Sequence, residues 1–485
     1  MSISASLNNA LSGLTANARA AELVSSNVAN ATNPSYARRE IVLGARVVGD
    51  TGQGVSVLGV DRVVDLALLS DSRIAEAASS AGNLRTAFHA RFEGVIGSNS
   101  DAGSLTGRIA TFEGALIEAT SRPDSEARLA NVAASLQQVT QAFATASGSI
   151  QEGRLRADRA IASQVSQLND ALTRVQNMNV LIRVAVSSGS DASSLMDQRQ
   201  QAVDQISTIV PIRQLQRDHD QIALMTAGGA TLLDGKAAVF GFSPINLITP
   251  DMTLASGALS GLTVNGRPVQ VGVPPGTVDG GTLAAHFDVR DRLAVTAQAA
   301  LDAVARNLIT RYQDPALDLT RAPGAPGLLT DAGSVFVATN EIGLAARLKI
   351  NDAVNPDAGG ALWRLRDGLG AVTPGPPGNG TLLLQLHGAV TQPLAAATGP
   401  FGGGARSFAA LTGDLSSLAA SSRINAEANA SFARARADSL QDLRLAQGVD
   451  TDQEMQKLLV IEQAYSANAK VVQTMDELIQ ILMGL

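Results

Sequence analysis

Cysteine is absent from all 485 residues, and aromatic residues make up only 3% of the chain, with a single tryptophan. The absence of cysteine excludes disulfides, thiolate nucleophiles and cysteine-based metal sites. It suits an exported protein but also arises by compositional drift. The apolar content is mostly Ala, Leu, Val and Ile, and these small residues favour close contact between helices over a thick globular core.

The chain also has no excess of basic charge and no long apolar run. Its net charge of −7 gives no support for binding nucleic acid, which requires a basic face. The opening "MSISASLNNALSGLTANARA" has neither the basic nor the apolar region of a Sec signal peptide. Arg183 interrupts the longest apolar run, so we expect no membrane insertion.

The first expected helix, residues 4–31, carries apolar or small residues at alternating steps of four and three. This 3.5-residue period is typical of a coiled-coil seam. The side chains in it are small or few, so the helix needs a partner to be stable. The seam consists of Leu7, Leu11, Leu14, Ala18, Ala21, Ser25 and Val28.

The last expected helix has the same period and keeps it to the end of the chain. It follows a break at "QGVDTDQE" and closes with the apolar sequence "LIQILMGL", which predicts burial against a partner. Its seam consists of Leu458, Ile461, Tyr465, Asn468, Val472, Met475, Ile479 and Leu482.

Between these helices the pattern predicts further helices and two strand-containing parts. "EIVLGARVVG" and "VSVLGV" flank "DTGQG", whose glycines predict a hairpin turn over residues 40–60. Residues 108–210 are helical with clean seams, ended by Pro211. Asn179 is the one polar seam member, and it either fixes the register or lies off the seam in solvent.

Residues 211–281 alternate weakly and contain a hairpin signal, Asn265-Gly266. Helix returns at 282–312. Residues 313–405 are rich in Gly and Pro, and apolar pieces there such as "TLLLQLHGAV" could form strands.

We therefore predict a mainly α fold with long coiled-coil helices from both chain ends and an inserted β-rich domain. The expected organisation is 1–40, N-terminal tube helix and turn; 41–210, hairpin and coiled-coil helical domain; 211–281, β-rich outer domain; 282–312, returning helix; 313–406, irregular β-containing variable region; 407–450, C-terminal part of the helical domain; and 451–485, C-terminal tube helix.

Catalytic motifs are not found. The histidines at 89, 219, 286 and 387 share no metal-ligand spacing, and "GGATLLDGKAA" fails the phosphate-loop pattern and is read as a turn. The paired acids of "DQRQQAVDQ" and "DTDQEMQ" are read as solvated helix faces. We expect no catalytic, cofactor or metal residues. Periodicity alone favours equally a self-contained helix bundle and a subunit that polymerises through its terminal helices.

One segment distinguishes these alternatives. "NVANATNPSYARR", residues 27–39, resembles the signature N-[LI]-A-N-x-x-T-P-G-Y-x-R of bacterial flagellar rod, hook and junction proteins, with Asn33 and Ser35 as departures. In physical terms, Asn30 tolerates the left-handed conformation that closes a helix, Pro34 keeps Asn33 extended, and Tyr36 packs as an anchor.

Three more segments resemble one branch of this group, the FlgK-type hook-associated proteins of the hook–filament junction. They are "GQGVSVLGVDRVVDLALL" (52–69), "SSLMDQRQQAVDQISTIV" (193–210) and "GVDTDQEMQKLLVIEQAYSANAKVVQTMDEL" (448–478). The resemblance covers residues 1–210 and 407–485 well and 211–406 only by position. We expect the C-terminal segment to be the most specific, because rod and hook proteins share the opening signature.

The resemblance implies a structural protein that is secreted without a Sec signal and assembles in the flagellar axis. Its implied partners are copies of itself, hook protein, a second junction protein on the flagellin side, and the flagellar export apparatus with its chaperone. It also implies terminal helices that fold on assembly. The alternatives are a hook or rod protein, or a secreted scaffold with an enzymatic or adhesive module in 211–406.

Overall fold

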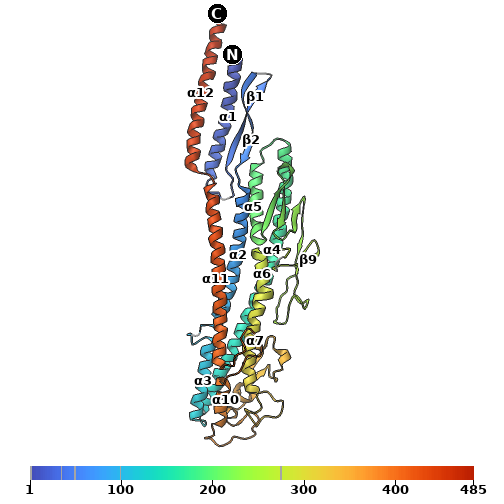
Figure 1. Cartoon of the computed structure of the whole chain (residues 1–485), viewed down its shortest axis with the longest axis vertical. Helices are drawn as coiled ribbons and strands as arrows, with labels where there is room; N and C mark the ends of the chain where they lie inside the picture. Colours follow the sequence, from blue (N-terminus) through green and yellow to red (C-terminus); the bar gives the residue numbers. More distant parts are fainter. Residues whose placement is uncertain (1–2, 34, 49–50, 99, 273–275, 485) are drawn as a thin grey trace.

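The computed structural model describes residues 3–33, 35–48, 51–98, 100–272 and 276–484. Figure 1 shows an elongated molecule in which both ends of the chain lie together at one extremity. Long helices lead away from that extremity and return to it, and the small strands of the inserted region lie against the middle of the molecule. The predicted fold class is confirmed.

Helices make up the greater part of the described chain. A π-helical turn, Val289–Leu293, joins α6 to α7. The helices are α1 (Ile3–Ala29), α2 (Leu66–Ile96), α3 (Leu105–Ser121), α4 (Glu126–Ser187), α5 (Ser193–Ile209), α6 (Gly281–Asp288), α7 (Ala294–Gln313), α8 (Leu344–Arg347), α9 (Arg364–Asp367), α10 (Thr381–Thr391), α11 (Phe408–Ala446) and α12 (Thr451–Met483).

The strands form small antiparallel sheets in the orders β1-β2, β3-β4-β5-β6, β7-β8-β9 and β10-β11. They are β1 (Arg39–Val48), β2 (Thr51–Arg62), β3 (Ile212–Gln216), β4 (Ile222–Thr226), β5 (Thr231–Asp234), β6 (Lys236–Ala237), β7 (Phe240–Gly241), β8 (Leu262–Val264), β9 (Arg267–Val269), β10 (Leu329–Asp331) and β11 (Leu348–Ile350).

The long helix α4 organises two hydrophobic cores. Its first half buries Leu136 and Phe143 in a core shared with α3, α7, α10 and α11. Its second half buries Leu168 and Leu172 against α5 and the strands of the inserted region, including Leu224 of β4. The two apolar seams predicted from the sequence therefore lie on one 62-residue helix, and each packs against a different set of elements.

Asn179 lies on the second seam of α4 and is buried. Its side-chain Nδ2 donates to the carbonyl of Ile222 (2.8 Å), while its Oδ1 accepts from Arg199 Nη1 (2.9 Å) and from the amide of Ile222 (3.3 Å). Of the two alternatives left open by the sequence, the solvated Asn179 is therefore wrong. Through these bonds Asn179 joins β4 and α5 to α4. This polar residue in the seam thus positions the inserted strands against α4.

The predicted hairpins are present, with one shift. Asn265 and Gly266 both take positive φ between β8 and β9, as this turn requires. The first hairpin also forms, but Gly52 and Gly54 belong to strand β2 and its tip, residues 49–50, lies outside the described residues. "GGATLLDGKAA" is a turn between short strands, as expected, with positive φ at Gly235.

The expectation that "TLLLQLHGAV" could form a strand is wrong, because this segment forms α10. Its buried side chains, Leu383, Leu386 and Val390, recur at steps of three and four and pack into the core around α4. The glycine- and proline-rich sequence on either side conceals this short period. Strand structure in the region is confined to the pair β10–β11.

Asp302 of α7 is a buried carboxyl in this core, 2% exposed. It accepts hydrogen bonds from Gln298 Nε2 (2.9 Å) and from the amides of Gly343 (2.7 Å) and Ala345 (2.9 Å), which fixes the start of α8. Burial nevertheless outweighs these bonds and raises the pKa of Asp302 to about 6.

A carboxyl whose pKa is higher in the folded than in the unfolded chain stabilises the fold most at low pH. We expect this contribution to be full below the unfolded pKa of 3.8 and lost as the pH rises through about 6. The free energy of unfolding of the parent chain, minus that of Asp302→Asn, should therefore fall by about 2 kcal/mol between pH 4 and pH 7. Urea unfolding at a series of pH values measures this difference. Asp357→Asn, at an exposed site, is the control, and a difference that does not change with pH would contradict the assignment.

Candidate functional site

The two terminal helices pack side by side and run in opposite directions (Figure 1). Gly13 of α1 lies against Asn468 of α12 so closely that a Cβ at residue 13 would be 2.8 Å from Asn468 Nδ2. Further along, Asn27 of α1 is bonded to Glu454 of α12 (2.9 Å). These two contacts set the register of the antiparallel pair.

The structure brings most of the predicted seam residues to this helix pair but buries none of them fully. Leu11, Tyr465 and Leu482 are exposed, and Pro34 lies outside the described residues. The half-buried members are Leu7, Leu14, Val28, Asn30, Tyr36, Leu458, Ile461, Asn468, Val472, Met475 and Ile479.

On α1 the face that meets α12 is not the leucine seam. The fully buried positions of this helix are Ala10, Ala16, Leu23, Val24 and Asn27. Small side chains at this face let the two backbones approach, as the contact at residue 13 shows. The seam of Leu7, Leu11 and Leu14 lies on another face, where Leu11 is exposed and the other two leucines are half-buried.

The hairpin β1–β2 covers a third face of α1. The hydroxyl of Ser12 accepts a hydrogen bond from the amide of Val55 (3.1 Å). Gly54 has a φ of +89°, and a Cβ there would collide with the Ser12 hydroxyl. A glycine at residue 54 thus permits both the strand conformation and the close approach of the hairpin to α1.

The helix stop after α1 is built around the side chain of Asn27, which is 1% exposed. Its Nδ2 donates to the carbonyl of Arg39 (3.0 Å) and to Glu454 Oε2 (2.9 Å). Its Oδ1 accepts from the Tyr36 hydroxyl (2.8 Å) and from the amide of Arg39 (3.0 Å). Every donor and acceptor of this amide is used.

Tyr36 acts as the anchor predicted from the sequence. Its ring packs under the Arg39 guanidinium, 4.8 Å from the ring centre, and its hydroxyl lies 3.3 Å from Ser26 Oγ. The expectation for Asn30 is wrong, because this residue does not take the left-handed conformation. Its side chain instead donates back to the carbonyl of Ser26 (2.9 Å), which closes the last turn of α1.

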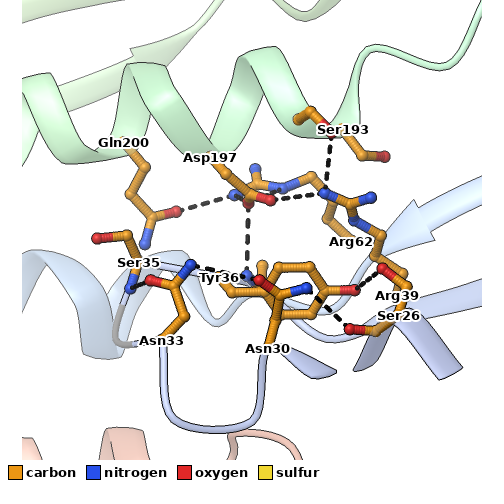
Figure 2. Close-up of polar contacts among 12 residues, drawn as sticks. Ser26, Asn30, Asn33, Ser35, Tyr36, Arg39, Arg62, Ser193, Asp197 and Gln200 are labelled. Atoms are coloured by element: carbon orange, nitrogen blue, oxygen red, sulfur yellow. Dashed lines mark hydrogen bonds and ion pairs between the residues drawn. The ribbon is translucent and has the colours of Figure 1, made fainter. Parts of the chain in front are cut away.

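A second cluster ties the same segment to α5, and Figure 2 shows it as converging polar side chains. Asp197 accepts from Arg39 Nη2 (2.8 Å) through one carboxylate oxygen and from Arg62 Nη2 (2.6 Å) through the other. Gln200 also accepts from Arg62 (3.1 Å). The side chains of Asp197, Arg39 and Arg62 are each between 11% and 13% exposed, so both pairs are largely shielded from solvent.

We call these two clusters together the joint; it consists of Asn27, Tyr36, Arg39, Arg62, Asp197 and Glu454. The joint connects four elements: the end of α1, the hairpin, α5 and the start of α12. Glu454 is itself 1% exposed and paired with Lys457 (2.7 Å). The reading of Asp197 and Glu454 as solvated acids is wrong. Their partners within the joint lie 135 or more residues away in sequence, which no local pattern reveals.

The described residues offer little for other chemistry. They contain no group of three or more His, Asp or Glu side chains arranged to hold a metal ion. A search of the described helices for one long and apolar enough to cross a membrane finds none. The arrangement instead combines a firmly bonded joint with helix faces that remain open.

Comparison with known proteins identifies this arrangement. The family model of the flagellar hook-associated protein FlgK helical domain matches residues 90–325, and that of the flagellar basal body rod FlgEFG protein C-terminal region matches residues 446–485. The second match corrects one expectation: the C-terminal segment does not separate a junction protein from a rod protein. The helical domain makes that distinction.

Individual relatives agree with the first match. Flagellar hook-associated protein 1 of Salmonella typhimurium is 27% identical over 243 residues, which are 49% of this chain and 44% of the relative. The Bacillus subtilis protein of that name is 24% identical over 240 residues, 47% of each chain. The chain thus matches about half the length of these relatives. A solved structure of the flagellar hook junction protein FlgK from Burkholderia pseudomallei aligns with a TM-score of 0.44 at 16% identity, covering 54% of this chain and 47% of that one.

The fold and the two family matches define a structural protein of the bacterial flagellum. Within that class, the match of the helical domain and the relatives support a FlgK-type hook-associated protein.

The first prediction for the joint concerns its buried amide. Asn27→Ala removes four hydrogen bonds and leaves the buried Glu454 carboxylate with fewer partners, at a cost of about 3 kcal/mol. We expect amide hydrogen exchange to accelerate about a hundredfold at the start of α12 and in residues 36–39. Asn8→Ala, an exposed asparagine on the same helix, should change neither. Unaltered exchange in Asn27→Ala would show that the amide does not hold the segments together.

The second prediction concerns the charge cluster. Asp197→Asn leaves Arg39 and Arg62 without a carboxylate in a largely shielded site, which costs about 3 kcal/mol. Hydrogen exchange should rise in β1–β2 and α5, while the far core around α4 and α10 keeps its protection. Asp170→Asn, an exposed aspartate on α4, is the matched control. Equal behaviour of the two variants would contradict a role for Asp197 in holding the hairpin.

Proposed function

We propose that this chain is a structural adaptor at the junction between flagellar hook and filament, and that it assembles through its terminal helices. The observation that carries the proposal is the terminal helix pair: α1 and α12 extend beyond the helical domain on a bonded joint, yet keep apolar faces open. Leu11, Val460 and Ile481 are each more than half exposed. Exposed apolar surface of this kind is characteristic of an interface.

The pair is suited to an axial tube because its own contacts are modest. The closest approach of α1 to α12 is at Gly13, and no residue of α12 other than Glu454 is fully buried. Isolated helices with so little burial are marginally stable. Neighbouring copies would supply the missing contacts, so we expect the terminal helices to gain much of their stability on assembly.

In this proposal each part of the chain has a place. Residues 1–40 and 451–485 line the tube, 41–210, 282–312 and 407–450 form the helical domain around it, and 211–281 lie on the outside, with 313–406 as a variable region. The partners are further copies of the chain, hook protein on one side and a second junction protein on the flagellin side. The chain reaches the outside of the cell through the flagellar export apparatus, with a chaperone, and has no catalytic role.

A hook or rod protein is the second candidate, and the match of residues 446–485 to the rod-protein model favours it specifically. The helical domain at residues 90–325 weighs against it. An enzymatic or adhesive module in 211–406 finds no support, because the buried acids, arginines and tyrosine of that region, such as Asp302, Arg311 and Tyr312, are engaged in hydrogen bonds within the core.

Deletion of the gene tests the proposal. We expect electron microscopy to show hooks without filaments and immunoblotting to show flagellin in the medium, because filament subunits would have no platform on which to assemble. Reintroduction of the parent gene should restore filaments. Rods without hooks would assign the chain to a hook or rod role, and normal filaments would contradict an axial role altogether.

A further inference from the structure

Helix α12 carries two apolar stripes, of which only one meets α1. The first contains Ile461, Val472 and Ile479, which are half-buried in the helix pair. The second stripe, which we define as Val460, Ala467, Val471 and Leu478, recurs at steps of seven, four and seven residues. Residues at such steps share one side of a helix. All four are exposed; Val460 is 66% exposed.

Helix α1 carries a partly open stripe of its own, the leucine stripe, in which Leu7 and Leu14 are half-buried and Leu11 is exposed. The hairpin contacts α1 through Asn9 and Ser12. At 3.6 residues per turn the leucine stripe lies on the face of α1 opposite to these residues. Leu11 at its centre is 57% exposed.

The two stripes face opposite sides of the helix pair. Lys457 marks the flank of α12 that is turned toward the hairpin, because its Nζ lies 3.8 Å from Glu40 Oε1 on β1. Val460, Ala467 and Val471 lie along that same flank, since they follow Lys457 at helical spacing. The second stripe therefore faces the hairpin side of the pair, whereas the leucine stripe faces away from the hairpin.

We propose that the leucine stripe of one copy packs against the second stripe of α12 in the next copy. The inference rests on the proposed axial assembly and names the contact that carries it. Each α1 would then lie between two α12 helices, its own and that of its neighbour. The contact is heterologous, so it repeats from copy to copy and builds a ring or a helical tube.

Charge supports a second copy as the occupant. Residues 3–18 of α1 contain no charged side chain, and the second stripe is bordered on its solvent side by Gln456, Gln463 and Thr474. Packing the two together buries no unpaired charge, which would otherwise oppose association. If the leucine stripes of two copies packed against each other instead, a two-fold axis would relate the copies, and the assembly would end at a dimer.

The absence of cysteine from the parent chain allows a direct test by disulfide formation. Leu11→Cys is combined in turn with Val460→Cys, Val471→Cys and Leu478→Cys, and flagella purified from the complemented deletion strain are oxidised. A disulfide forms only where the two Cα atoms approach within about 7 Å. The three positions sample the axial offset between neighbouring copies. We expect at least one double variant to give a ladder of cross-linked chains on a non-reducing gel.

Matched controls define the outcome. Leu459→Cys with Leu11→Cys should give no ladder, because residue 459 is 57% exposed but lies a quarter turn away from the second stripe. If the chain is present in flagella but none of the three double variants forms a ladder, the inference is wrong while the proposed function stands. Dimers from Leu11→Cys alone would also overturn it, in favour of leucine stripes that face each other. Absence of the parent chain from flagella would overturn the proposed function and the inference with it.

A second measurement does not depend on cysteine. Leu11→Glu places a charge in the leucine stripe and should lower the amount of chain in purified flagella at least tenfold, whereas Leu459→Glu should not. Both sites are exposed in the single chain, so neither substitution disturbs its core. Equal incorporation of Leu11→Glu and the parent chain would contradict the proposed contact.

Discussion

The side chain of Asn27 is the constraint on which the terminal part of the molecule depends. Its amide is buried, and it is satisfied only because α1 ends there, Tyr36 and Arg39 follow in a fixed path, and Glu454 arrives from the other end of the chain. An unpaired buried amide is costly. The three segments therefore have to adopt their positions together, which explains why a helix with so little bulky surface ends in such a firm stop.

Asp197 extends this constraint to the helical domain. It receives Arg39 from the same stop segment and Arg62 from the end of the hairpin, and it is carried by α5, which packs on α4. The direction of the terminal helices is thus set by side chains rather than by a linker. A helix pair that is oriented before it meets its neighbours loses less conformational freedom on association. The bonded joint therefore lowers the entropic cost of packing the open apolar faces against a neighbour.

A feature could be predicted from the sequence when the residues that determine it lie close together in the chain. The seams of α4 and α12 and the Asn265-Gly266 turn were predictable because their periods and turn residues are local. Asn179 was ambiguous because its partner, Ile222, lies on a strand 43 residues away. The roles of Asp197 and Glu454 depend on still more distant segments, and a surface acid and a buried one look alike in sequence. Helix α10 was missed because glycine and proline surround its three buried apolar residues.

The hairpin gives the terminal helix pair its polarity. By occupying one face of α1 through Ser12 and Gly54, it leaves that helix two other faces, one with small residues and one with leucines. Gly13 meets α12 of the same chain, where a Cβ would lie 2.8 Å from Asn468 Nδ2. Leu11, at the centre of the leucine stripe, remains exposed. The leucine stripe and the second stripe of α12 face opposite sides of the helix pair, and a chain with this polarity is physically suited to a repeating assembly.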